Sequence, residues 1–445
     1  MRRAVIAYVI LYVAVAAYSP YLQQYYKGLG ISLGTIGALV AFTSAVALIS
    51  APTWGAIHDR YPTSRFFLPL AAGIGALGAT GLATVGASLL LIPSAAAFAL
   101  GMAGMGPMMD VRVLDMAGSD RTRYARVRVW GSISFMVCTP IVGFAIGEDY
   151  RGLFFVAVPM ILLGGLAAML LPGRAGGVHG VSLRRAPGRV LGHRPIALFL
   201  IGALVGWTAV YAQSTFFSIY LRGLGASSDQ IGLAWSIQAA LEVPSMIFFP
   251  QLSRRFGTER LIVLGMAIIA CRLIANTLFV SPSVLIACSL VQGAGYGLLL
   301  IGGIAFVSRQ APKGTAATAQ GILNGVTFSL SVIIGSGVGG QLAGWLTIRG
   351  LYAVSAGLGL VAIVLIALAV LPASGRPGNP TRSEPVAVDS RVDRVGHDLR
   401  PERAEVEAVA RVLRHVYTRR RGERGVDVDH DELVDVAEVD DRRVE

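Results

Sequence analysis

Long apolar runs separated by short polar segments dominate the first 372 residues. Stretches without a charged side chain cover 4–26, 31–57, 66–109, 129–147, 152–173, 195–221, 314–348 and 350–375. A further run over 230–253 is interrupted only by Glu242, and another over 261–308 only by Arg272. A helix needs about 20 residues to cross a bilayer, so 66–109 and 261–308 are each long enough for two helices. The pattern predicts an all-α integral membrane protein with twelve transmembrane helices.

The basic residues of the loops are distributed unevenly. When alternate loops are placed on the side of the N-terminus, that side holds nineteen Lys and Arg residues before the C-terminal tail. The other loops hold four: Lys27, Arg151, Arg222 and Arg349. Because cytoplasmic loops of membrane proteins carry an excess of Lys and Arg, the asymmetry predicts that both termini are cytoplasmic.

An internal repeat with an offset of 195 residues divides the apolar region. The sequence Lys-Gly-Leu-Gly at 27–30 recurs as Arg-Gly-Leu-Gly at 222–225, and Ile36-Gly37 recurs as Ile231-Gly232. Parallel repeats of six helices are typical of transporters whose halves are related by an axis along the membrane normal. We therefore predict two six-helix bundles with a substrate site between them.

The repeat and the composition together define four regions. We assign 1–171 to an N-terminal six-helix bundle, 172–194 to a cytoplasmic linker and 195–372 to a C-terminal six-helix bundle. The remainder, 373–445, is a hydrophilic cytoplasmic tail that we expect to be largely disordered. Within the tail, apolar residues recur at helical spacing over 401–421 and predict a short amphipathic helix.

Composition excludes several classes of protein. Hydrophobic residues make up 54% of the chain and charged residues 14%, whereas soluble domains have about a quarter charged residues. The net charge of +12 does not indicate nucleic-acid binding, because the basic residues lie in loops between apolar runs. Cys138, Cys271 and Cys288 fit no metal-ligand spacing, and we find no nucleophile and base in a catalytic pattern. We expect no metal, no cofactor, no nucleic-acid partner and no enzymatic activity.

One loop motif indicates a family. The segment Gly55-Ala-Ile-His-Asp59-Arg60, followed by Arg65, resembles the motif that the major facilitator superfamily carries between its second and third helices. The resemblance implies a twelve-helix transporter in which Gly55, Asp59, Arg60 and Arg65 form a conformational latch. The alternative is that these arginines serve only to set the topology.

A second motif resembles a narrower branch of this superfamily. Residues 124–132, Tyr-Ala-Arg-Val-Arg-Val-Trp-Gly-Ser, and 107–110, Pro-Met-Met-Asp, are similar to segments of lactose permease and the phenylpropionate-permease-like transporters. The resemblance implies that Arg128 contacts the substrate, with Asp110 opposite. Alternatively, both residues are ordinary inner-loop charges.

Two charged residues lie deep within predicted spans. Glu242 and Arg272 are near the middle of consecutive helices, where an unpaired charge costs at least ~2.5–3.5 kcal/mol. We therefore expect them to lie within reach of each other and to couple transport to protons. A purely structural ion pair is the alternative. The tenth predicted helix, which contains 290–298, lacks the His and acid of lactose permease. Either proton coupling relies on Glu242 alone, or the protein is a uniporter.

Polar and aromatic residues within the spans are candidates for the lining of a substrate cavity. Gln238 and Glu242 are four residues apart and share one helix face, and Trp235 is close to that face. Tyr211 and Gln292 are the other candidates. For each of these residues, ordinary helix packing is the competing interpretation.

The leading hypothesis is a secondary transporter of the cell membrane that takes up a small organic solute with protons. Alternating access between the two halves would carry the solute across the bilayer. An exporter of drugs or metabolites is the first alternative, and a non-transporting membrane receptor is the alternative from another class. The expected partners are a small molecule, protons and the lipid bilayer, with the chain as a monomer.

Overall fold

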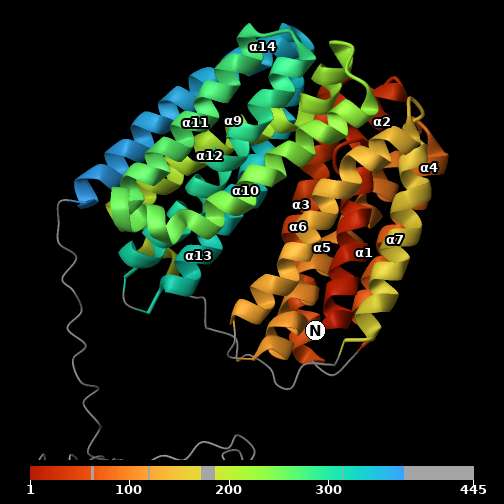
Figure 1. Cartoon of the computed structure of the whole chain (residues 1–445), viewed down its shortest axis with the longest axis horizontal. Helices are drawn as coiled ribbons and strands as arrows, with labels where there is room; N and C mark the ends of the chain where they lie inside the picture. The colour runs from red at the N-terminus through yellow and green to blue at the C-terminus, as the bar shows by residue number, and fades with distance from the viewer. Residues whose placement is uncertain (62–64, 119–120, 172–185, 313, 375–445) are drawn as a thin grey trace, which may run out of the picture. The chain divides into compact units, whose positions relative to one another are not determined.

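The computed structural model describes residues 1–61, 65–118, 121–171, 186–312 and 314–374, and Figure 1 shows that its regular elements are helices. Residues Met1–Arg376 form one compact unit that contains all of these helices. Most of the predicted linker and nearly all of the predicted tail, including 401–421, lie outside the described residues. The described part confirms an all-α protein.

The first half of the unit contains seven helices. They are α1 (Arg2–Tyr18), α2 (Leu22–Gly28), α3 (Leu33–Arg60), α4 (Phe67–Val85), α5 (Leu91–Ala117), α6 (Arg121–Ile146) and α7 (Gly152–Met169). α1 packs on α6 and α7, α4 packs on α5 and α7, and α3 packs on α5. The first predicted span is thus two helices, because α1 ends at Tyr18 and α2 begins at Leu22.

The second half begins with a short helix in the predicted linker. Its elements are α8 (Ala186–Leu191), α9 (Arg194–Gly223), α10 (Ser228–Phe256), α11 (Thr258–Leu278), α12 (Pro282–Gln310), α13 (Ala316–Gly325), the π-helix η1 (Val326–Leu330) and α14 (Ser331–Ser374). α14 packs along α9 and α11, whereas α12 packs along both α10 and α11. α10 and α11, although consecutive in sequence, touch each other only slightly. This order of packing decides where Glu242 and Arg272 lie.

Eleven segments of the described chain are long and apolar enough to cross a membrane. The last of them, Thr318–Leu371, has 54 residues and would be about 80 Å long as one straight helix. Thr347 interrupts it with φ 72° and ψ 165°, so that two helices join at this residue. The boundary predicted at Arg349 is therefore found two residues earlier, at a non-glycine residue in a strained backbone conformation.

The predicted repeat is visible in the backbone. α2 ends at Gly28 and α9 ends at Gly223, and each is followed by a glycine with positive φ, Gly30 at 80° and Gly225 at 92°. Glycine adopts this conformation without the steric penalty of a side chain. The next helices start at positions that are again 195 residues apart, α3 at Leu33 and α10 at Ser228.

Most of the helix contacts between the halves are made by two pairs, α3 with α14 and α6 with α10, and α2 also touches α9. Small residues bring these backbones together: a β-carbon on Gly37 would overlap the carbonyl oxygen of Ser336, and one on Gly232 would lie 2.7 Å from the carbonyl oxygen of Thr139. Such close packing is the usual means by which membrane helices associate, since lipid is as apolar as the side chains.

Candidate functional site

A cavity of about 350 Å³ lies between the two halves. Ser19, just after α1, and helices α2, α3 and α6 of the first half contribute to it, as do α9, α10, α12 and α14 of the second. Its lining combines aromatic, amide and hydroxyl groups with one carboxylate: Ser19, Gln23, Val40, Phe135, Val210, Tyr211, Ser214, Thr215, Trp235, Gln238, Ala239, Glu242, Gln292, Tyr296 and Val332. We call this space the central cavity. A few polar groups in an otherwise apolar, concave wall are typical of small-molecule sites.

Five predicted residues line the central cavity together: Tyr211, Trp235, Gln238, Glu242 and Gln292. The indole nitrogen of Trp235 donates a hydrogen bond to Ser218 Oγ at 3.1 Å, which fixes the orientation of the ring. The Oε1 atom of Gln292 is buried and has no hydrogen-bond partner among the described residues. Because a buried acceptor without a partner is costly, this amide is suited to bind a ligand hydroxyl.

Gln23 and Ser214 also line the central cavity, although the sequence did not single them out. Gln23 lies near the end of the first apolar run, and Ser214 lies within the run over 195–221. Their only signal was a polar side chain inside a span, which many helix-packing residues share.

Glu242 is held by close contact between α10 and α12. Gly293 and Gly297 of α12 face α10, and a β-carbon on Gly293 would lie 3.0 Å from the backbone nitrogen of Glu242. The glycines let α12 approach closely, so the backbone of Glu242 is held while its carboxylate lines the cavity. A carboxylate in this position can bind hydroxyl groups or exchange a proton with the cavity.

Arg272 does not meet Glu242, contrary to the expected contact. Its Nη1 donates to Gln213 Oε1 at 2.7 Å and its Nη2 donates to Ser289 Oγ at 3.2 Å. Its guanidinium also lies 4.5 Å from the centre of the Phe217 ring. The physical reason is that α12 packs between α10 and α11, so Arg272 faces α9 and α12 while Glu242 faces the cavity.

Asp110 and Arg128 lie together in the first half. Arg128 Nε is 3.9 Å from Asp110 Oδ1, and each side chain is about one-third exposed. Tyr8 donates a hydrogen bond from its hydroxyl to the same carboxylate oxygen. The Arg128 guanidinium lies 4.6 Å from the centre of the Tyr12 ring, a cation–π distance. Helix α1 thus presents two tyrosines to a charge pair formed by α5 and α6.

The residues of the predicted latch lie at the end of α3 and just beyond it. Gly55 is within α3, Arg60 is its last residue, and Arg60 and Arg65 are exposed. The side chain of Asp59 lies outside the described residues. The latch therefore stays a prediction.

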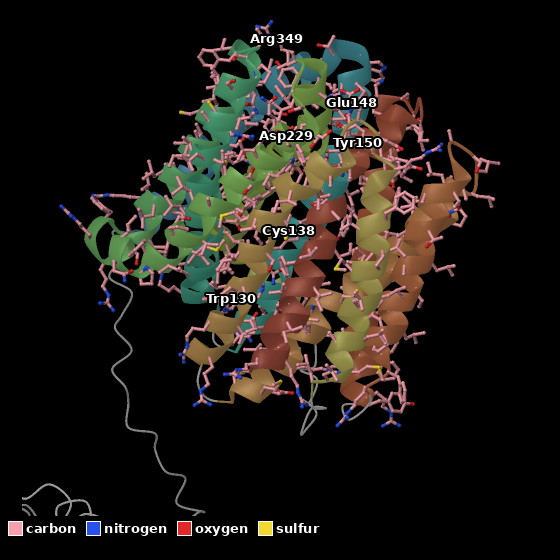
Figure 2. All side chains as sticks on the ribbon, turned by 45° about the vertical axis from the view of Figure 1, so that its right-hand side comes forward. Trp130, Cys138, Glu148, Tyr150, Asp229 and Arg349 are labelled. Atoms are coloured by element: carbon pink, nitrogen blue, oxygen red, sulfur yellow. The ribbon has the colours of Figure 1, made fainter. Side chains whose placement is uncertain are left out.

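The halves also contact each other through polar groups at one end of the unit. Arg222 Nη2 donates to Glu148 Oε1 at 2.6 Å, and Ser228 Oγ donates to the Tyr150 hydroxyl at 3.0 Å. Ser228 bonds the carbonyl of Gly147. Figure 2 shows Glu148 at the same end as Asp229 and Arg349, with Trp130 toward the opposite end.

Comparisons with known proteins give one family. Residues 2–354 match the model of the MFS_1 like family. The maltose permease of Geobacillus stearothermophilus is 26% identical over 337 residues, which cover 75% of this chain and 86% of the permease. The sucrose permease of Escherichia coli is 25% identical over 310 residues, which cover 64% of this chain and 72% of the permease.

Solved structures show the same fold. The nucleoside transporter NupG matches with a TM-score of 0.74 and 15% identity, covering 82% of this chain and 98% of the transporter. A bacterial homologue of the iron transporter ferroportin, in an inward-facing state, matches with a TM-score of 0.64 and 16% identity, covering 84% of this chain and 98% of that one. The matches confirm the resemblance that the two motifs predicted.

Proposed function

Since the chain belongs to the MFS_1 like family, we propose that this multi-pass protein of the cell membrane takes up a small sugar-like solute together with protons. The family and the named relatives are transporters, so secondary transport itself is the common property. The observation that carries the proposal is the central cavity, where one carboxylate faces amides and aromatic rings. Aromatic faces and amides suit a sugar ring, which has apolar faces and a hydroxyl rim.

The proposal includes twelve spans with both termini in the cytoplasm. The break at Thr347 divides the last long segment into two helices, and each is long enough to cross a bilayer. The positive-inside asymmetry supports the orientation. The end with Glu148, Asp229 and Arg349 is then the outer end (Figure 2).

This orientation makes the structure an inward-facing state of a monomeric carrier. The polar contacts between Arg222 and Glu148 and between Ser228 and Gly147 join the halves at the outer end. Alternating access requires these contacts to break when the other side closes. The six helices on each side of the central cavity would move as bundles, within the boundaries 1–171 and 195–372.

Each candidate residue has a role in this scheme. Arg128, held by Asp110, offers a planar fork to paired hydroxyls of the solute. Gln238, Gln292, Tyr211 and Trp235 orient the solute from the second half, and Glu242 takes up and releases the proton. Arg272 supports the wall of the cavity through Gln213. The named relatives are permeases, so the exporter alternative is not favoured.

The proposal is tested in proteoliposomes with a pH-sensitive dye inside. Maltose, sucrose, methyl glucosides, methyl galactosides and nucleosides are added in turn, and we expect internal acidification with at least one sugar. Binding of a sugar without translocation or counterflow would indicate a receptor instead. Translocation without acidification would indicate a uniporter, and a response to nucleosides alone would reject the sugar class.

The first variant to measure is Glu242→Gln. An amide cannot release a proton, so we expect uphill accumulation to be lost, with solute reaching equal concentrations on both sides. Counterflow, which needs no net proton movement, should persist. Glu259→Gln is the matched control, because this carboxylate pairs with Arg309 at 2.6 Å, outside the lining of the central cavity. Unchanged acidification in Glu242→Gln would remove Glu242 from the coupling mechanism.

A further inference from the structure

A second cavity of about 340 Å³ adjoins the central cavity in the first half. It lies among α1, α2, α3 and α5. Gln23 and Val40 line both cavities and therefore mark their junction. A molecule that reaches past these two residues from the central cavity would enter the second space, which we call the side cavity.

The chemistry of the side cavity differs from that of the central cavity. Aromatic and aliphatic groups form most of its wall, with Tyr18 and Phe98 in edge-to-face contact at 4.9 Å between ring centres. Ala47 and Met102 contribute further apolar surface. The described residues that line it include no charged side chain.

Two of the hydroxyl groups in the wall, those of Thr43 and Ser44, already have partners. Thr43 donates to the carbonyl oxygen of Val40 at 3.0 Å, and Ser44 donates to the same oxygen at 2.8 Å. Both protons are thus directed into the helix backbone rather than toward a ligand. A second sugar ring carries several hydroxyls, and this mostly apolar wall offers few groups to pair with them. Hydroxyls buried without partners are costly. An apolar group has no hydrogen bonds to lose in this cavity, and its burial is favourable.

From this contrast we propose that the transported solute is a glycoside whose sugar ring occupies the central cavity and whose apolar aglycone occupies the side cavity. The inference rests on the proposed function and narrows its substrate class. It separates this chain from a carrier of disaccharides, in which both subsites have to satisfy hydroxyl groups. We commit to the substrate rather than a lipid chain as the occupant, because Gln23 and Val40 line both the side cavity and the polar central cavity.

The test compares three ligands that differ only in the aglycone: methyl, phenyl and glucosyl derivatives of the same glucoside, in both anomers, with galactosides as a parallel series. Each competes with its radiolabelled methyl glycoside in counterflow by the full chain in proteoliposomes. Burial of a phenyl ring predicts about tenfold tighter competition by the phenyl glycoside than by the methyl one. The disaccharide is expected to compete no better than the methyl glycoside.

A variant that fills the side cavity provides the second arm. Ala47→Phe should remove the advantage of the phenyl group and leave competition by the methyl glycoside within about twofold. Ala353→Phe is the matched control, since Ala353 is exposed on α14 and lines neither cavity. Equal competition by all three ligands, or an equal loss for all three in Ala47→Phe, would overturn the aglycone subsite while leaving sugar transport intact. Absence of counterflow with every glycoside would instead reject the sugar class and the subsite with it.

Discussion

Arg128 and Arg272 are both arginines within membrane-spanning helices, yet their surroundings are opposite. Arg128 is one-third exposed, faces a carboxylate at 3.9 Å and lies over the ring of Tyr12. Arg272 is 3% exposed and bonds only neutral groups among the described residues, Gln213 and Ser289. The first is a partly exposed charge. The second is a charge that is buried within one half.

The difference bears on which arginine takes part in transport. A charge that must bind and release a solute needs access to water and a partner that it can exchange. Arg128 has both, because Asp110 is its partner and is equally accessible. Arg272 is fixed by two hydrogen bonds and by the ring of Phe217, so its contribution is to hold α9, α11 and α12 together. Substitutions of Arg128 should therefore weaken solute binding, whereas substitutions of Arg272 should lower stability.

The largest effect is expected for Arg128→Gln. In the proposed function Arg128 donates charge-assisted hydrogen bonds to the solute, and losing one costs about 1.5–3 kcal/mol, or roughly ten- to a hundredfold in affinity. Solute binding to the purified protein, followed by tryptophan fluorescence, measures this loss. Arg126→Gln is the matched control, because Arg126 is exposed two residues earlier on the same helix. An equal loss in both variants would mean that only loop charge matters.

A smaller effect of a different kind is expected for Arg272→Lys. Lysine keeps the charge but cannot reach Gln213 and Ser289 with one planar fork. The loss of one charge-assisted hydrogen bond predicts about 1.5 kcal/mol less stability, seen as a lower Tm in detergent. Solute affinity and proton coupling should stay within about twofold of the wild type, since the lining of the central cavity is unchanged.

The opposite pattern would contradict the comparison. If Arg272→Lys melted like the wild type but no longer coupled transport to protons, Arg272 would act in coupling, as the sequence alone suggested. A double change of Arg272 and Gln213 to leucine tests the pairing independently. Its loss of stability should be smaller than the sum of the two single losses, because the two side chains share one hydrogen bond.

The sequence was sufficient for the features that depend on neighbouring residues. Hydropathy located the helices, and the repeat predicted that the turns at Gly30 and Gly225 would match, as they do. The pairing of Asp110 with Arg128 followed from a motif resemblance. These features arise from local rules, namely span length, glycine in a left-handed turn and short motifs.

The order in which helices pack could not be predicted in the same way. Every face of a membrane helix is apolar, so hydropathy does not tell which helices are neighbours. Glu242 and Arg272 were expected to meet because their helices are consecutive, but the glycines of α12 let that helix pack between them. The bond from Tyr8 to Asp110 joins residues 102 positions apart, and no local pattern indicates such a contact.

The smallest effect is expected from breaking the ion pair of a third arginine, Arg222, at the outer end. Arg222 pairs with Glu148 at 2.6 Å, and the Glu148 side chain is 82% exposed. Exposed ion pairs contribute about 0.2–1 kcal/mol. In the proposed mechanism this pair favours the state in which the outer end is closed. Glu148→Gln should therefore shift the population toward the outward-open state by at most about fivefold.

Accessibility of the central cavity from outside measures this shift. Cys138, Cys271 and Cys288 are first replaced by serine. Ser214, which lines the central cavity, is then replaced by cysteine. The introduced thiol is labelled with a membrane-impermeant maleimide. Labelling should be a few times faster in Glu148→Gln, and high salt, which screens exposed charges, should reduce the difference. Asp229→Asn is the matched control, since it removes one negative charge at the same end of the molecule (Figure 2). A change much larger than fivefold would mean that Glu148 has a further role in closing the outer end, whereas no change would leave closure to the close helix packing around Gly37 and Gly232.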